Sequence, residues 1–207
     1  MPKRLYRAAV GDPRVFARKR ERVAVNTAIH LVIDLSGSMG APVRSGDGTV
    51  KRRCQIAQES ALALALALDG INGVSVAVTA FPGLSGVDDL VTTLVRHGEH
   101  PRARAGAFLQ GQRGGTPMAG ALWFAAADLL ARPESRRIVL LLTDGKPDNH
   151  ADTTEILQLC AASGLETVGV GIDVDVSTLF RTALRVRDVT ELKTALFGAA
   201  ERLLLAA

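Results

Sequence analysis

The stretch IHLVIDLSGSMG, Ile29 to Gly40, joins an apolar run to a short polar segment. The run from about Ala28 to Leu35 has the length and composition of a buried strand. One carboxylate, Asp34, stands near its end, and two hydroxyls, Ser36 and Ser38, follow among glycines. Alternate residues of an extended segment point to the same side, so all three oxygens can face one way. The stretch is compatible with a nucleophile, a phosphate cradle, a metal site or ordinary turn chemistry.

Further along the chain, apolar runs alternate with segments of helix-forming residues. We expect strands over residues 28–35, 74–81, 90–96, 137–143, 165–172 and 183–189. We expect helices over residues 50–69, 117–131 and 152–162, and a last helix from residue 190. Strands that alternate with helices indicate a doubly wound α/β fold, in which helices flank a mostly parallel central sheet. The run at 90–96 is more polar than the others, which suits an edge strand.

Two apolar features fall inside predicted helices. ALALALALD, residues 61–69, alternates with period two, a pattern typical of strands, but Ala and Leu are both strong helix formers. On a helix its leucines lie on two sides, so the helix is buried between layers or has a side that binds a partner. Trp123 lies in the middle of the helix predicted at 117–131 and is expected in the core.

Length and composition favour one α/β domain with an appendage. The chain has 207 residues, of which 47% are apolar and 22% charged, and its net charge is +4. Basic residues are concentrated at the amino terminus. We therefore divide the chain into a basic arm or linker, residues 1–27, and a domain, residues 28–207. The arm has no recognisable nucleic-acid-binding module, so a solvated linker is favoured over a nucleic-acid contact, which would show steep salt dependence.

Cysteine usage and hydropathy suggest a reducing compartment. Cys54 and Cys160 are the only cysteines, and both fall in predicted helices without a CxxC spacing or clustered histidines. We therefore expect neither a disulfide framework nor a zinc site. His30, inside the first strand, is expected to be a hydrogen-bonded core histidine. The amino-terminal stretch is charged and no apolar run approaches the roughly 20 residues of a membrane span, so we expect a cytoplasmic protein.

Several kinds of site lack their motif. A phosphate-binding loop needs G-x-x-x-x-G-K-[ST], which the chain does not contain. A nucleophile elbow needs G-x-S-x-G, and the spacing around Ser36 and Ser38 does not match it. An aspartyl phosphotransferase of the D-x-D type would need a second carboxylate at position 36. These mismatches leave a metal site or turn chemistry as the readings of the first loop.

Two later loops supply further oxygens at matching places in the predicted fold. Thr116 lies in GGTPM, just before a predicted helix, and Asp144 directly follows the strand RIVLLLT. Ligands of doubly wound sheets bind outside the carboxyl ends of the strands, where these loops should lie. Two carboxylates and three hydroxyls suit a hard cation such as Mg²⁺, or Mn²⁺ or Ca²⁺. Because hydroxyls are neutral, the ion stays electrophilic and should accept a carboxylate from outside. Each loop taken alone also has a simpler reading, as a helix cap or a turn.

The segments DLSGSMG, GGTPM and LLLTDGKPD, in this order and at these intervals, resemble a von Willebrand factor A (VWA) domain with a metal-ion-dependent adhesion site. The resemblance spans about residue 28 to the carboxyl terminus and implies a Rossmann-like α/β fold. It assigns the metal to Asp34, Ser36, Ser38, Thr116 and Asp144. Residues expected to support these ligands or to contact a partner are Gly37, Gly115, Gly145, Lys146 and Asp148.

The sequences of the last two motifs, GGTPM and LLLTDGKPD, resemble those of the bacterial intracellular branch of this family. That branch includes carboxyl-terminal domains of cobaltochelatase-type and nitric-oxide-reductase-activation-type proteins, which work with ring-forming MoxR-like AAA+ ATPases. The resemblance implies a non-catalytic adaptor whose ion is completed by an Asp or Glu of a partner protein. One alternative stays open, a Mg²⁺-dependent hydrolase or transferase that uses the ion as a Lewis acid. Its general base would have to be Lys146 or His150.

Overall fold

The computed structural model describes residues 26–44, 48–84, 90–186 and 189–205, so the expected basic arm, apart from residues 26 and 27, lies outside the described residues. Six strands form one sheet in the order β5-β4-β1-β6-β7-β8. Their bounds are β1 Thr27–Asp34, β4 Val74–Phe81, β5 Thr92–Val95, β6 Arg136–Thr143, β7 Glu166–Ile172 and β8 Thr182–Val186. Neighbouring strands run parallel, except that edge strand β5 is antiparallel to β4. The prediction of a mostly parallel sheet is confirmed.

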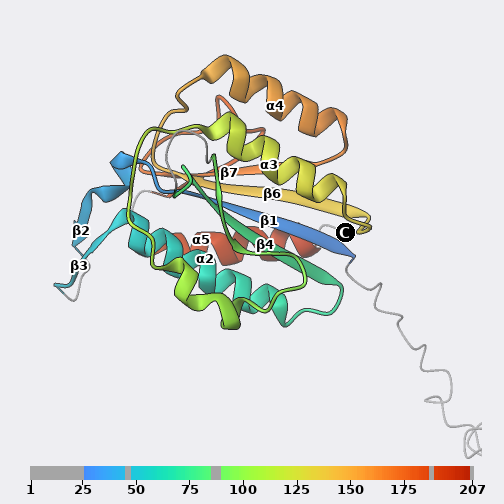
Figure 1. The fold of residues 1–207 in the computed structure, drawn as a ribbon, viewed down its shortest axis with the longest axis horizontal. Coiled ribbons are helices and arrows are strands. Elements are labelled where there is room, and N and C mark those ends of the chain that lie inside the picture. The colour runs from blue at the N-terminus through green and yellow to red at the C-terminus, as the bar shows by residue number, and fades with distance from the viewer. Residues whose placement is uncertain (1–25, 45–47, 85–89, 187–188, 206–207) are drawn as a thin grey trace, which may run out of the picture.

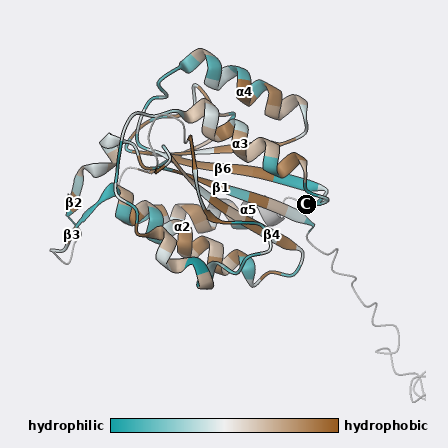
Figure 2. Cartoon of the chain, viewed as in Figure 1, coloured by the Kyte–Doolittle hydropathy of each residue, from teal (hydrophilic) through white to brown (hydrophobic). Residues whose placement is uncertain are grey.

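Helices cover both faces of the sheet, as Figure 1 shows. One face carries α3 (Met118–Leu130) and α4 (His150–Ala162), and the other carries α2 (Arg53–Asp69) and α5 (Val189–Leu205). Two 3-10 helices, Gly37–Gly40 and Pro101–Phe108, lie in the connections. In Figure 2 the hydrophobic stretches of β1 and β6 lie in the middle layer, between the helices. This doubly wound arrangement is the fold class predicted from the sequence.

Strand β1 is the centre of both apolar cores and is buried along its whole length. Ile29, Leu31 and Ile33 pack toward α2 and α5, whereas Ala28 and Val32 pack toward α3 and α4. The alternation follows from the two-residue period of a strand, and a parallel strand covered on both faces needs apolar residues on each. His30 and Asp34 are the polar residues on the α3 side, and both are buried.

Helix α2 explains the alternating ALALALALD segment. Leu64 and Leu68 are buried, and α2 packs on β1 and β4 and also against α5. Leu66 points elsewhere and is 41% exposed. The helix therefore packs on the sheet with one side and against the neighbouring helix α5 with another, which accounts for apolar residues on more than one side.

The predicted start of this helix at residue 50 is wrong. Val50–Arg52 forms strand β3, which pairs antiparallel with β2 (Pro42–Arg44) in a separate two-stranded sheet. Helix α2 begins only at Arg53. The helical composition of the KRRCQIAQES segment hid strand β3, because this strand forms only by pairing with β2, which comes earlier in the chain.

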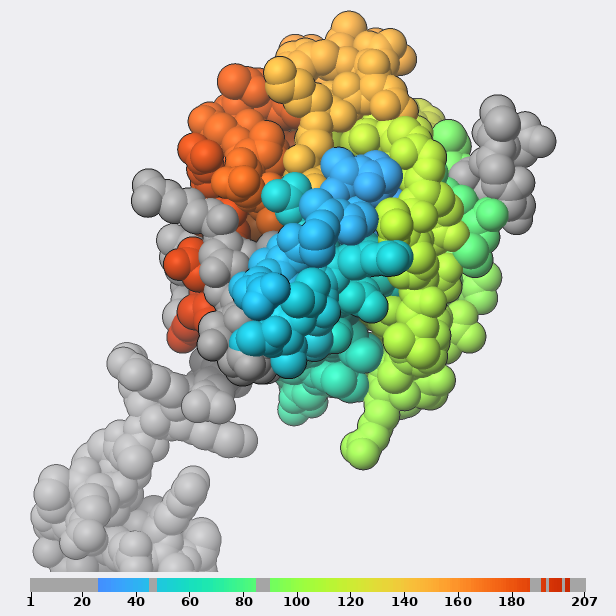
Figure 3. All heavy atoms as spheres, turned by 90° about the vertical axis from the view of Figure 1, so that its left-hand side faces the viewer, coloured from blue at the N-terminus to red at the C-terminus, as the bar shows by residue number. Residues whose placement is uncertain are grey.

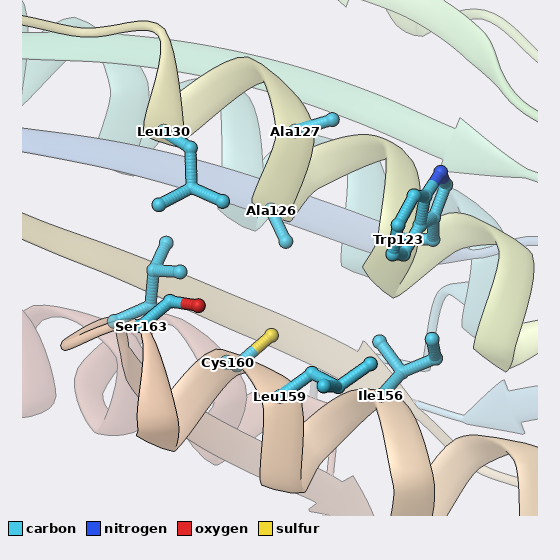
Figure 4. A pocket seen from close by; sticks show the side chains of 9 residues that line it. Trp123, Ala126, Ala127, Leu130, Ile156, Leu159, Cys160 and Ser163 are labelled. Atoms are coloured by element: carbon cyan, nitrogen blue, oxygen red, sulfur yellow. The ribbon is translucent and has the colours of Figure 1, made fainter.

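The expectation that Trp123 lies in the core is also wrong. Its side chain is 58% exposed and borders an open apolar pocket of about 360 Å³ between α3 and α4, shown in Figure 4. The pocket is lined by Trp123, Ala126, Ala127, Leu130, Ile156, Leu159, Cys160, Ser163 and Leu165. The helical period alone could not tell the face of α3 that packs on β1 from the face beside α4.

Both cysteines are buried and free, Cys54 on α2 and Cys160 on α4. These helices cover opposite faces of the sheet. Among the helices of the described residues, none has the length and apolar character needed to cross a membrane.

Candidate metal centre

The loops after β1 and β6 lie side by side at the carboxyl end of the sheet. Strands β1 and β6 are neighbours, but the helix that follows β1, α2, covers one face and the helix that follows β6, α4, covers the other. Loops that diverge in this way leave a crevice, where doubly wound folds bind ligands. Figure 3 faces this end of the molecule, with the segment after β1 (blue) between the segment before α3 (yellow-green) and the segment after β6 (orange).

Asp34 ends β1 inside this crevice and is fully buried. Its Oδ1 accepts a hydrogen bond from the backbone N–H of Ser36 at 2.7 Å, and its Oδ2 accepts one from Thr143 Oγ1 at 2.5 Å. Burial raises the pKa of the Asp34 carboxyl, and the bonds from Ser36 and Thr143 act in the opposite direction. A buried carboxylate needs such donors, or a cation, to stay charged.

The two serines extend from Asp34 toward β6. Ser36 Oγ and Ser38 Oγ are 3.1 Å apart, and Ser38 Oγ donates to Asp144 Oδ1 at 2.7 Å. Ser38 is exposed although Ser36 is buried. The backbone N–H of Gly37 donates to the carbonyl of Gly114 at 3.1 Å, which ties this loop to the segment before α3. The first loop is thus in direct contact with both of the others.

Thr116 is held in place by Asp148. Both carboxylate oxygens of Asp148 accept from the backbone N–H of Thr116, at 2.9 and 2.8 Å, and Asp148 N–H donates to the Thr116 carbonyl at 3.0 Å. A Cβ on Gly115 would lie 2.7 Å from the Asp148 carboxylate, so only glycine fits there without movement. Asp148 therefore supports the loop that carries Thr116.

Gly145 brings the remaining hydroxyl into the cluster. A Cβ built on Gly145 would lie 3.5 Å from Ser38 Oγ and 3.8 Å from Thr116 Oγ1, so both hydroxyls face the same point of the backbone. The five residues assigned to the metal are thus assembled from three loops. Lys146 and His150, the two candidate bases, are exposed, and the His150 ring lies 3.4 Å from Thr154 Oγ1 in its own helix.

Arg53 is a member of the site that the sequence did not indicate. Its Nη1 donates to Asp144 Oδ2 at 2.7 Å, and the Asp144 side chain has no exposed surface. Its Nη2 lies 3.9 Å from Asp173. Nothing in the run KRR, residues 51–53, distinguishes the residue that reaches the site. Lys51 pairs with Glu59 instead, at 2.7 Å, on the exposed surface.

This donor set is compatible with a small hard cation. All of the side-chain atoms that could bind the metal are oxygens, two from carboxylate groups and three from hydroxyl groups. Such oxygens are the ligands that Mg²⁺ and Ca²⁺ take in proteins. Gly145 adds no side chain to the space that Ser38 and Thr116 share. One oxygen of Asp144 faces Ser38 and the other is bound to Arg53.

Comparison with known proteins identifies the domain. The family model for the von Willebrand factor type A domain matches residues 29–146, which include all five residues assigned to the metal. Collagen alpha-1(VI) chains of Homo sapiens and Mus musculus are 41% identical to this chain over 64 residues, 31% of this chain and 6% of theirs. The chain therefore spans only a small part of the length of these curated relatives.

Solved structures agree on the fold. The pilus adhesin SpaC of Lactobacillus rhamnosus GG superposes with a TM-score of 0.72 at 17% identity, covering 86% of this chain and 30% of that one. The domain of the pili tip protein Mfa5 of Porphyromonas gingivalis gives 0.69 at 12% identity, covering 89% and 97%. A von Willebrand factor type A protein of Catenulispora acidiphila gives 0.64 at 22% identity, covering 83% and 41%. With the sheet order, the crevice and the family match in agreement, the chain belongs to the von Willebrand factor type A domain family.

Proposed function

We propose that this domain is a metal-dependent protein-binding module. A Mg²⁺ ion, or Mn²⁺ or Ca²⁺, would be held by Asp34, Ser36, Ser38, Thr116 and Asp144. An Asp or Glu side chain of a partner protein would complete its coordination. VWA domains are typically metal-dependent protein-interaction modules, and the family match supports this class.

The charge of the cluster carries the proposal. Its two carboxylates, on Asp34 and Asp144, are partly offset by the Arg53 guanidinium bound to Asp144 at 2.7 Å. The three hydroxyls add no charge. A divalent ion in this set would therefore keep a net positive charge, and a carboxylate from outside would neutralise it.

Exposure gives a partner access to the ion. Ser38, Gly37 and Gly115 are exposed, whereas Asp34 and Ser36 lie beneath them and are buried. The buried residues would therefore bind the ion on its protein side, and a coordination position on the solvent side would stay accessible to a partner. Mg²⁺ keeps several waters in such sites, and one of them can be exchanged for a ligand.

Metal-dependent unfolding is the first test. An ion that binds only the folded chain stabilises it by about 2.7 kcal/mol at 100 times its Kd, which raises Tm by roughly 5–11 °C in a domain of this size. We expect this rise with Mg²⁺ in the wild type and a smaller one in Ser38→Ala. Ser163→Ala is the matched control, since Ser163 is an exposed serine at the far end of α4. Equal shifts in all three proteins would refute the metal assignment.

Partner capture is the second test. The immobilised domain, with Mg²⁺ or with EDTA, is offered a partner bearing an exposed carboxylate. We expect binding with Mg²⁺, loss of binding with EDTA and in Ser38→Ala, and retention in Ser163→Ala. Metal-dependent turnover of a phosphoester or peptide, lost in Ser38→Ala, would instead favour the hydrolase or transferase.

The partner class is the finer part of the proposal. The resemblance of GGTPM and LLLTDGKPD to the bacterial intracellular branch supports a MoxR-like AAA+ ATPase as partner, with this domain as a non-catalytic adaptor. The two free, buried cysteines are consistent with a reducing cytoplasm. Co-purification of such an ATPase from the cytoplasmic fraction, dependent on Mg²⁺, tests both. Recovery of the chain on the cell surface would contradict the location and leave the metal-dependent module intact.

A further inference from the structure

A second cluster of metal-binding side chains lies away from the loops described above. It consists of His30 in β1, His97 just after β5 and Asp128 in α3. One ligand atom from each of the three lies within 4.8 Å of the other two. His30 precedes Asp34 by four residues of the same strand, which places the clusters about 13 Å apart along β1. The new cluster is therefore on the α3 side of the sheet, not at its carboxyl end.

Two ring nitrogens of this cluster lack a well-formed hydrogen bond. His30 Nδ1 lies 3.0 Å and His97 Nε2 3.4 Å from the same oxygen of Asp128, Oδ2. Neither nitrogen has a hydrogen-bond partner of acceptable geometry among the described residues, although both are buried. The side chains of His30 and His97 are 1% and 3% exposed. Each of these two buried nitrogens faces the same carboxylate oxygen without forming a well-shaped hydrogen bond to it, and a cation between the three groups would satisfy all of them.

We propose that His30 Nδ1, His97 Nε2 and an oxygen of Asp128 bind a transition-metal ion of the Zn²⁺ type. The separations suit it, because ligands about 2.0–2.2 Å from a tetrahedral Zn²⁺ lie about 3.3–3.6 Å from one another. The observed His–Asp128 separations of 3.0 and 3.4 Å are close to this range, and the ligand atoms of the two histidines lie within 4.8 Å of each other. Three protein ligands leave a fourth position for water.

The far sides of both rings are already oriented for this role. Ser75 Oγ lies 2.8 Å from His97 Nδ1, and Thr79 Oγ1 lies 3.2 Å from His30 Nε2. When these hydroxyls accept from the ring N–H groups, the opposite nitrogens present lone pairs to the ion. Metal-bound histidines are usually fixed by such an outer bond.

Two features favour a metal site over a purely hydrogen-bonded group of side chains: the exposure of Asp128 and the presence of two histidines. The Asp128 side chain is 40% exposed, which gives an ion a path from solvent. A serine–histidine–aspartate triad of Ser75, His97 and Asp128 would leave His30 without a role, whereas a metal uses both imidazoles. No local sequence pattern indicates this site, because its three residues are far apart along the chain and lie in β1, after β5 and in α3.

The test uses the full chain with Mg²⁺ in excess, so that the carboxyl-end crevice is saturated. Zn²⁺ binding is followed by competition with a chromogenic chelator, and Co²⁺ binding by its visible spectrum, which reports the coordination geometry. We expect one tight Zn²⁺ and a low-coordinate Co²⁺ spectrum in the wild type. Asp128→Asn, isosteric and partly exposed, should weaken binding by about 100-fold or more, as should His97→Gln.

Two controls make the outcome specific. His100→Gln applies the same substitution to a histidine whose side chain is 80% exposed, and it should bind Zn²⁺ like the wild type. Ser38→Ala removes a donor of the other site and should also leave Zn²⁺ binding unchanged. No Zn²⁺ binding by the wild type, equal binding by Asp128→Asn, or loss of binding in Ser38→Ala alone would each overturn the proposal. Should His97→Gln fail to fold, the Asp128→Asn comparison still decides.

Discussion

Removing Arg53 should affect the metal-free and the metal-bound protein differently. In Arg53→Met, the Asp144 carboxylate loses its guanidinium partner at 2.7 Å while its side chain stays buried. Breaking a buried ion pair costs about 3–5 kcal/mol, and the 26% exposure of Arg53 reduces this to roughly 2–3 kcal/mol. The Tm of the metal-free protein should therefore fall by roughly 4–12 °C.

A bound divalent ion would take over the compensation of Asp144. We expect the cost of Arg53→Met to be about 1 kcal/mol in saturating Mg²⁺, so that Mg²⁺ binding tightens by the difference. That difference, about 1–2 kcal/mol, corresponds to roughly 5- to 30-fold in Kd. The ion would also keep less positive charge, so an acidic partner should bind the loaded variant more weakly.

The assay is chemical or thermal unfolding with and without Mg²⁺, together with calorimetric titration of the ion. Lys51→Met is the matched control, because the Lys51–Glu59 pair is exposed and such pairs contribute about 0–1 kcal/mol. An equal loss of stability with and without Mg²⁺, or weaker Mg²⁺ binding by Arg53→Met, would refute the argument. Arg53 would then act only by orienting Asp144.

Three further predictions concern the supporting residues. Asp148→Ala removes both acceptors of the Thr116 N–H, so it should cost about 1–3 kcal/mol in unfolding and weaken Mg²⁺ binding in the same titration. Gly169→Ala places a Cβ 2.5 Å from the buried Phe180 ring, and it should destabilise by about 1–3 kcal/mol without changing metal affinity. The pKa of His97 is lowered from 6.5 to about 4 by burial, with Asp128, His30, Arg132 and Glu134 around it, so the unfolded metal-free chain takes up a proton first. Its unfolding free energy should fall by up to about 1.4 kcal/mol per pH unit between pH 6.5 and 4, and a pH series on His97→Gln that keeps this slope would contradict the assignment.

Local pattern predicted most of the fold. Strand 74–81 was predicted at its observed bounds, and the strands near 28–35, 137–143 and 165–172 are each within one residue or so of the structure. The apolar runs of these strands are long enough, and the turn residues beside them clear enough, to identify them as strands from the sequence pattern. The β2–β3 hairpin was missed because three-residue strands carry little periodicity, and their existence depends on each other.

In the candidate site, too, the sequence indicated some residues, and only the structure identified others. The sequence identified Asp34, Ser36, Ser38, Thr116 and Asp144 as candidate ligands, and the fold assembles them; their metal-binding role stays a prediction. It did not single out Thr143 as a donor to Asp34 or Arg53 as the partner of Asp144. A lone threonine at a strand end or an arginine at a helix start has no distinguishing local pattern.

By itself, the sequence determined the alternation of strands and helices and the oxygen-rich loops, because strand period, turn glycines and capping preferences depend on neighbouring residues. Only the tertiary structure decided which side chains meet. The β5-β4-β1-β6-β7-β8 order brings residues about a hundred positions apart to one crevice. The same packing places His30 and His97 beside Asp128, on the α3 side of the sheet and away from its carboxyl end. Such contacts depend on strand order and on which face each helix covers, and those follow from burying the two apolar cores of the whole chain at once.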